Sequence, residues 1–225
     1  MIPYKLVRSR RKTVAIHITK NAEVEVRAPL KMPKADIDRF VAEKEKWIEK
    51  SIGRREQINT EKSGFTLHYG DTVMLAGNMY PINVREGKRA GFDGECFYMP
   101  SNLTPDEIKN AVVQVYKAIA KRIIQNKVVE YAKLMNVKPV GIKITSAKTR
   151  WGSCSGKNSI NFSWRLVMAD DDVIDYVVVH ELAHIREHNH SPRFWAVVES
   201  ILPDYKQRQN KLKLLQKQLA VQDWD

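Results

Sequence analysis

The chain has 225 residues, of which 43% are hydrophobic, and this fraction can form a buried core, which excludes a disordered chain. Its formal net charge of +12 favours polyanionic partners without identifying one. There is no apolar run of about eighteen residues and no C-x-x-C pair around Cys96 or Cys154, so a membrane helix, a disulfide framework and a cysteine zinc cage are excluded, and a soluble protein of the reducing cytoplasm is expected.

The first hundred residues have the pattern of a small β-rich module. Residues 13–27 alternate apolar and polar side chains around a Lys-Asn turn, as a half-buried hairpin does. Apolar residues at helical spacing in 33–52 predict an amphipathic helix that packs on this hairpin. In 65–84, Gly-Asp and Gly-Asn pairs separate three expected short strands, and 95–99 is an expected fourth. The predicted N-terminal domain therefore spans residues 1–100.

A second domain is predicted to begin with a long helix. Thr104 and Glu107 have the spacing of a capping box, and Pro105 stands at the first helical position, so this helix is expected to reach about Met135. A strand at 141–146 follows it. The short apolar alternations within 148–164 then predict another hairpin.

The C-terminal part is predicted to be helical. Three consecutive aspartates, 170–172, are expected to cap a helix and to place negative charge at its N-terminus. This helix is expected to run through 174–188, and two further helices, 194–202 and 205–219, follow it. We therefore predict an α+β fold whose second domain spans residues 101–225.

The helix predicted over 174–188 carries an H-E-x-x-H pattern. His180 and His184 are four residues apart, so both imidazoles lie on one face and can bind one ion. Glu181 lies about 100° around the helix from His180, which places its carboxylate beside a water that the ion activates, where a general base belongs. The neighbouring residues are apolar, and buried His and Glu side chains without a partner would be costly. The pattern therefore indicates a catalytic zinc site.

A catalytic zinc ion needs a third protein ligand and keeps a position open for water or substrate. The candidates are Glu187, His188 and His190. On an unbroken helix His188 would lie about 12 Å of rise beyond His180, too far to share one ion comfortably. Asn189 favours the left-handed conformation that ends helices, so the chain is expected to turn there and to fold His190 toward the metal. We choose His190 and expect the other two candidates to be exposed or to act indirectly.

Three segments of the chain resemble those of a known family. RWGSCS (150–155), INFSWRL (160–166) and IDYVVVHELAHIREHNHSPRFW (174–195) are similar to the YgjP-like metallopeptidases. That family is related to the SprT-like and WLM zinc peptidases, which include DNA–protein crosslink proteases. RSRRKTVAIHI, VEVRAP and FVAEKEKWI look like the family's N-terminal module, so the resemblance covers nearly the whole chain.

The resemblance implies a zincin-like metallopeptidase domain with an H-E-x-x-H active-site helix. It implies that the segment RWGSC forms a strand beside the cleft, where an extended peptide substrate could add by backbone hydrogen bonds. It also implies that Zn²⁺ is bound, and that Glu181 acts in catalysis. The zinc ligands that it implies are His180, His184 and His190.

Other functions are weighed against a zinc metallopeptidase. Basic residues concentrated in 8–12 and 121–150 make a nucleic acid partner, and hence a DNA-associated protease, an alternative, although aromatic residues for base stacking are sparse there. A zinc-dependent hydrolase of a nucleotide lacks a phosphate-binding glycine loop. Glu181 argues against a non-catalytic zinc module, which would need no base. The stabiliser of the oxyanion stays open among Tyr205, Arg193 and Arg150, and no oligomeric state follows from the sequence.

Overall fold

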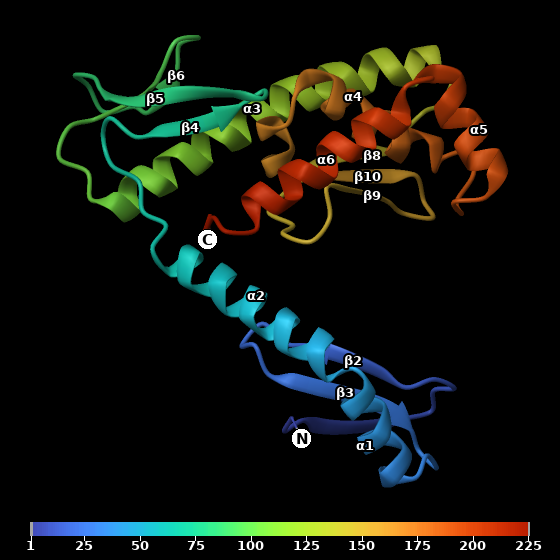
Figure 1. Cartoon of the computed structure of the whole chain (residues 1–225). Coiled ribbons are helices and arrows are strands. Elements are labelled where there is room, and N and C mark those ends of the chain that lie inside the picture. Colours follow the sequence, from blue (N-terminus) through green and yellow to red (C-terminus); the bar gives the residue numbers. More distant parts are fainter. Residues whose placement is uncertain (1, 225) are drawn as a thin grey trace. The chain divides into compact units, whose positions relative to one another are not determined.

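A computed structural model describes residues 2–224, which group into two compact units (Figure 1). The first unit comprises the residues up to Phe65 together with Ala220–Asp223, and the second comprises Thr66–Leu219 together with Trp224. Each unit is described by itself. None of the helices in the described chain combines the length and the apolar character that crossing a membrane requires.

The first unit is a three-stranded sheet with two helices. Its elements are β1 (Lys5–Ser9), β2 (Ala15–Ile18), β3 (Val24–Pro29), α1 (Lys34–Glu43) and α2 (Glu45–Ser63). Strand β3 is central and pairs antiparallel with β2, which confirms the predicted hairpin, and parallel with β1, which was not predicted. Val26 of β3 and Ile37 and Ile48 of the two helices are fully buried in one apolar core. The single helix predicted over 33–52 is two helices that meet at Lys44.

The second unit begins with a four-stranded sheet in the order β4-β5-β7-β6. Its strands are β4 (Thr72–Leu75), β5 (Asn78–Val84), β6 (Gly91–Phe92) and β7 (Phe97–Met99). Residues 65–84 contain two strands, β4 and β5, whereas three were predicted. Gly77 closes their turn with φ +77°, a backbone conformation that favours glycine. The predicted strand at 95–99 is confirmed as β7, whereas β6 was not predicted.

This sheet packs on the rest of the second unit, because the turn between β4 and β5 bonds to the short helix η1 (Trp164–Met168). The amide of Ala76 donates to the carbonyl of Val167 at 2.8 Å, and the hydroxyl of Tyr116 donates to the carbonyl of Met74 at 2.5 Å. The division into domains at residue 100 stays a prediction, and the observed packing favours an earlier one at Phe65.

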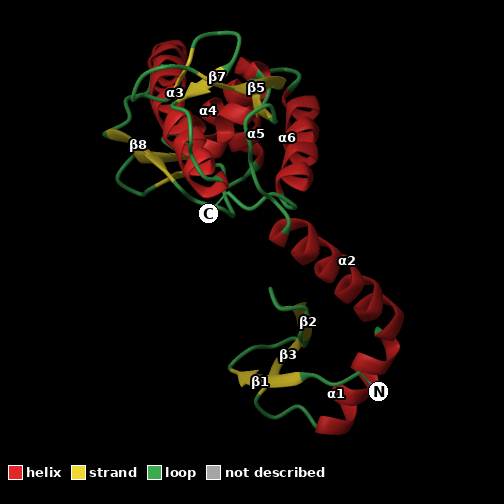
Figure 2. Cartoon of the chain, turned by 90° about the vertical axis from the view of Figure 1, so that its left-hand side faces the viewer, coloured by secondary structure: helices red, strands yellow, loops and turns green. Residues whose placement is uncertain are grey.

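The remaining elements of the second unit are four helices and three strands, and one of these helices lies among the other three (Figure 2). They are α3 (Pro105–Leu134), β8 (Gly141–Thr145), β9 (Gly152–Cys154), β10 (Ser159–Ser163), α4 (Asp171–Ala183), α5 (Pro192–Ile201) and α6 (Tyr205–Leu219). The predicted capping box at Thr104 is confirmed, as are the strand at 141–146, the hairpin β9–β10 and the two C-terminal helices. Helix α4 contacts α3, α5, α6 and β9, and Val178, Val179 and Leu182 on it are fully buried. A helix that is apolar on most sides belongs in such a position.

Candidate metal centre and active site

Helix α4 ends earlier than the sequence predicted. Its last helical residue is Ala183, and His184 is the C-cap, whereas the prediction extended it to residue 188 with a left-handed turn at Asn189. The amides of Ile185 and Arg186 instead donate to the carbonyls three residues before them, at 3.0 Å each. Hydrogen bonds to the third residue before, in place of the fourth, tighten the last turn of the helix. The described residues with positive φ do not include Asn189. The chain therefore leaves the helix just after its second histidine.

The three aspartates before α4 act by charge and by ion pairing. Asp170 is the N-cap residue, but its side chain makes no capping hydrogen bond and instead lies 3.3 Å from the ammonium of Lys211. The predicted side-chain cap is therefore wrong for this residue. Asp171 and Asp172 lie in the first turn, where negative charge is favourable.

His180, His184 and His190 converge at the end of α4. One ring nitrogen from each lies within 4.8 Å of the others, and the Nε2 atoms of His180 and His190 are 3.0 Å apart. Within residues 2–224 this is the single group of three His, Cys, Asp or Glu side chains that converge in this way. Neither His188 nor the carboxylate of Glu187 belongs to it.

The donor set of this cluster suits a metal cation. Two nitrogens bound at about 2.0–2.1 Å to one tetrahedral zinc ion lie about 3.3 Å apart, close to the observed separation of His180 and His190. The Nδ1 atom of His184 lies 3.2 Å from the carbonyl oxygen of Glu187, so an Nδ1–H donor there leaves Nε2 free for a metal. Burial, reinforced by the other two imidazoles, lowers the pKa of His180 to about 3. It therefore stays neutral, the form that binds a metal.

Glu181 is a buried carboxylate beside these rings. Its side chain is 6% exposed, and its Oε2 atom has no hydrogen-bond partner. Burial raises the pKa of Glu181 to about 7, against the opposing positive charge of Arg150. A buried acid with a free oxygen at this place can exchange a proton with a neighbouring molecule.

Gly152 on strand β9 makes room for Glu181, a contact that the sequence did not indicate. A Cβ atom at Gly152 would lie 2.5 Å from Oε1 of Glu181 and 2.7 Å from its Cδ. Such distances force the carboxylate to move. The backbone of β9 therefore positions this acid by direct contact.

Substituting Gly152 with Ala is expected to displace the carboxylate of Glu181 and to lower kcat/KM by at least about tenfold for any reaction in which this carboxylate moves a proton, because the group loses its alignment. Metal content should not change, since the three heavy atoms nearest to the new methyl group all belong to Glu181 and none to a histidine of the cluster. Gly141→Ala on β8 is the matched control, because its Cβ would meet only the Ser159 hydroxyl at 3.7 Å. Equal activities of the two variants would contradict this role of Gly152.

Aromatic rings hold the third histidine. The ring of His190 stacks on Trp195 with centroids 5.7 Å apart, and Trp195 stacks on the buried Tyr205 at 5.3 Å. Phe194 is fully buried, and its ring lies 4.7 Å from that of His190. Helix α5 presents both aromatic residues because Ser191 caps it, accepting the amide hydrogen of Phe194. In the sequence, the signal for this contact was the aromatic pair four and five residues after His190. That these two rings would hold the histidine was not predicted.

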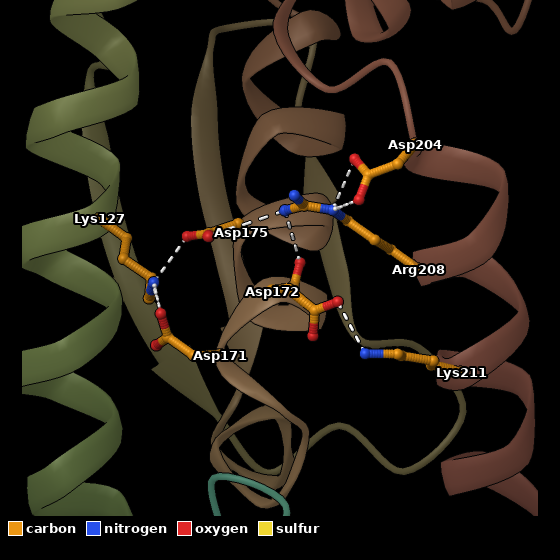
Figure 3. Close-up of polar contacts among 7 residues, drawn as sticks. All are labelled: Lys127, Asp171, Asp172, Asp175, Asp204, Arg208 and Lys211. Carbon is orange, nitrogen blue, oxygen red and sulfur yellow. Dashed lines mark hydrogen bonds and ion pairs between the residues drawn. The ribbon is translucent and has the colours of Figure 1, made fainter.

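Ion pairs fix α4 between α3 and α6 (Figure 3). Asp175 lies 2.6 Å from the ammonium of Lys127 on α3 and 3.7 Å from the guanidinium of Arg208 on α6. Lys127 also pairs with Asp171, and these ion pairs raise its pKa although burial opposes them. Further contacts join Arg208 to Asp204 and to the carbonyl of Asp172, and Lys211 to the carboxylate of Asp172. The helix that carries His180 and Glu181 is thereby held from both sides.

Replacing Asp175 with Asn is expected to lower the free energy of unfolding of the second unit by about 2 kcal/mol, because two largely buried cations lose their shared counter-charge. Hydrogen exchange of the α4 amides measures this change. Asp36→Asn, which removes an exposed pair with Arg39 on α1, is the control and should change stability little. If the α4 amides of both variants exchange alike, the network does not hold the helix.

The three candidates for stabilising an oxyanion differ in environment. Tyr205 is buried and stacked on Trp195, whereas Arg193 is exposed. Arg150 is also exposed, and its charge acts on Glu181. The contacts of these three side chains do not distinguish one of them for this role, which stays open.

Residues 12–214 match the family model described as YgjP-like, metallopeptidase domain. No curated protein matches the sequence. The metallopeptidase zymogen of Pyrococcus abyssi abylysin aligns with a TM-score of 0.37 and 20% identity, over 40% of this chain and 90% of its own. That of Methanocaldococcus jannaschii jannalysin gives 0.37 and 25%, over 42% and 95%. These two TM-scores are too low to carry an argument. The family match covers most of the sequence and confirms the resemblance: the chain belongs to the YgjP-like metallopeptidase family.

Proposed function

We propose that this metallopeptidase uses zinc held by His180, His184 and His190, with Glu181 as general base. The observation that supports this most directly is the convergence of three ring nitrogens within 4.8 Å, beside a buried carboxylate whose Oε2 has no partner. Family membership implies a metal ion and a peptide or protein substrate. Three nitrogen ligands with an open fourth position are typical of catalytic zinc.

In this proposal the chain's own residues bind the substrate and move a proton. A bound zinc ion supplies Lewis acidity, which makes a water molecule more acidic and polarises the scissile carbonyl. Glu181 accepts the proton of the attacking water at its free oxygen and delivers it to the leaving amine. A pKa of about 7 suits both transfers near neutral pH.

Strand β9 supports the binding of an extended peptide. It is one of the two edge strands in the order β8-β10-β9, and Gly152 on it touches Glu181. A substrate segment that pairs with the free edge of β9 brings its backbone to the candidate base through main-chain hydrogen bonds, which require no particular side chains. Hydrolysis of unfolded protein chains follows from this arrangement.

The test is hydrolysis of an unfolded protein by the purified chain, with its zinc content measured before chelation, after chelation and after adding back zinc. We expect one zinc ion per chain and cleavage that disappears and returns with the metal. Protein that holds zinc but cleaves no unfolded chain would contradict broad peptidase activity. Protein that binds no zinc would overturn the metal assignment.

The alternative functions gain no specific support. Lys127, within the basic stretch 121–150, is paired with Asp171 and Asp175, and the guanidinium of Arg8 donates to three backbone carbonyls. Both cations are therefore engaged within the protein, and we propose no nucleic acid partner. Cys96 and Cys154 are free thiols, which supports the proposal of a cytoplasmic location.

A further inference from the structure

A cavity of about 210 Å³ lies beside the candidate base, bounded by α4, β9 and α6. Glu181 and His180 line it from α4, and Gly152 lines it from β9. For comparison, an apolar cavity of about 150 Å³ is large enough to bind benzene. The cavity can therefore hold a large side chain next to the position where Glu181 acts.

The walls of this cavity differ in chemistry. Trp151, which directly precedes β9, and Val177 on α4 make two sides of the cavity largely apolar. Helix α6 contributes Leu212, two glutamine amides and the ammonium group of Lys213. Lys213 is exposed, and no ion pair involves it among the described residues. Among the residues that line the cavity, Lys213 is the one charged residue apart from the candidate catalytic groups Glu181 and His180.

The wall formed by α6 is held in place. Arg208 pairs with Asp175 of α4, and Lys211 lies 2.9 Å from Asp172 (Figure 3). Within the cavity lining itself, the amide of Gln209 donates to the hydroxyl of Tyr176 at 3.3 Å. The distance between Lys213 and the candidate base is therefore set by contacts between two packed helices.

We propose that this cavity binds the substrate side chain that flanks the scissile bond. Lys213 makes it select residues with an apolar stem and an acidic tip over lysine and arginine. The inference rests on the proposed function, because a peptide bond must first lie at Glu181 for a neighbouring side chain to enter. The apolar part of that side chain then contacts Trp151 and Val177, and its carboxylate meets the ammonium group of Lys213 on α6. A cationic side chain of the same length would place its charge against the ammonium of Lys213 and be repelled by it.

The first test measures kcat/KM for peptides in which Glu or Lys occupies each position flanking the cleaved bond in turn. We expect zinc-loaded wild type to prefer Glu at one of these positions, and Lys213→Glu to shift the Glu-to-Lys ratio there by at least about tenfold toward Lys. Lys217→Glu makes the same charge change on α6 outside the cavity and should leave the ratio unchanged. Zinc content and circular dichroism should be equal in all three proteins.

The second test fills the cavity. Gln216→Trp, at an exposed position that lines it, should lower kcat/KM about tenfold for peptides with Leu or Glu at the selected position. Peptides with Gly there should be cleaved as by wild type.

The failures of the two proposals are distinguishable. Cleavage with an unchanged ratio in Lys213→Glu, or an equal loss for the Gly peptide in Gln216→Trp, overturns the side-chain site alone. A zinc-loaded wild type that cleaves neither these peptides nor an unfolded protein overturns the proposed function and this inference together.

Discussion

Glu181→Gln is expected to lower kcat/KM for peptide hydrolysis by about 10² to 10⁴, the range that a general base contributes. Glutamine has nearly the shape of glutamate but cannot take up a proton, so the water would lose its acceptor while the cavity keeps its form. The zinc content should equal that of wild type, because His180, His184 and His190 are unchanged. Single-turnover hydrolysis at equal zinc occupancy measures the effect.

Glu187→Gln is the matched control for this substitution. Glu187 lies in the turn after α4, and its backbone carbonyl, which faces Nδ1 of His184, is retained in the variant. We expect it to keep activity close to that of wild type. If both variants are equally impaired, charge near the cluster matters more than a base at residue 181. If Glu181→Gln retains full activity, another group accepts the proton.

Local sequence patterns predicted the elements that depend on neighbouring residues. The capping box at Thr104 and the hairpins β2–β3 and β9–β10 rest on residues close together in the chain. The spacing of His180 and His184 likewise implies their approach through helix geometry alone. Strand β1 was missed because it pairs in parallel with β3, and parallel pairing leaves no turn signal in the sequence.

The rest of the candidate site depends on contacts between distant segments. The room that Gly152 leaves for Glu181 and the wall that α6 adds to the cavity are set by tertiary packing, which periodicity does not encode. His190 was chosen for a turn at Asn189, and its ring does reach the cluster. The helix ends earlier than predicted, at His184, where hydrogen bonds to the third residue before replace those to the fourth. The chain does bend at His188 and Asn189, but Asn189 does not have the left-handed conformation. The position was thus predicted for a partly wrong reason.

His190→Ala is expected to weaken zinc binding by at least about a hundredfold, because a three-ligand site would keep only two protein ligands. His188→Ala, two residues away in the same turn, should leave the affinity near that of wild type. Competition with a chromophoric chelator measures both values and requires no substrate. The pair therefore separates metal binding from catalysis.

The comparison also tests the geometry of the turn. His190 reaches the cluster because α4 ends at Ala183 and α5 presents Trp195 against its ring. If His188→Ala weakened zinc binding more than His190→Ala, the turn after α4 would have to bring His188 to the cluster in place of His190 in the metal-bound protein. Equal affinities in both variants and wild type would show that neither histidine is a ligand, and that two protein ligands suffice.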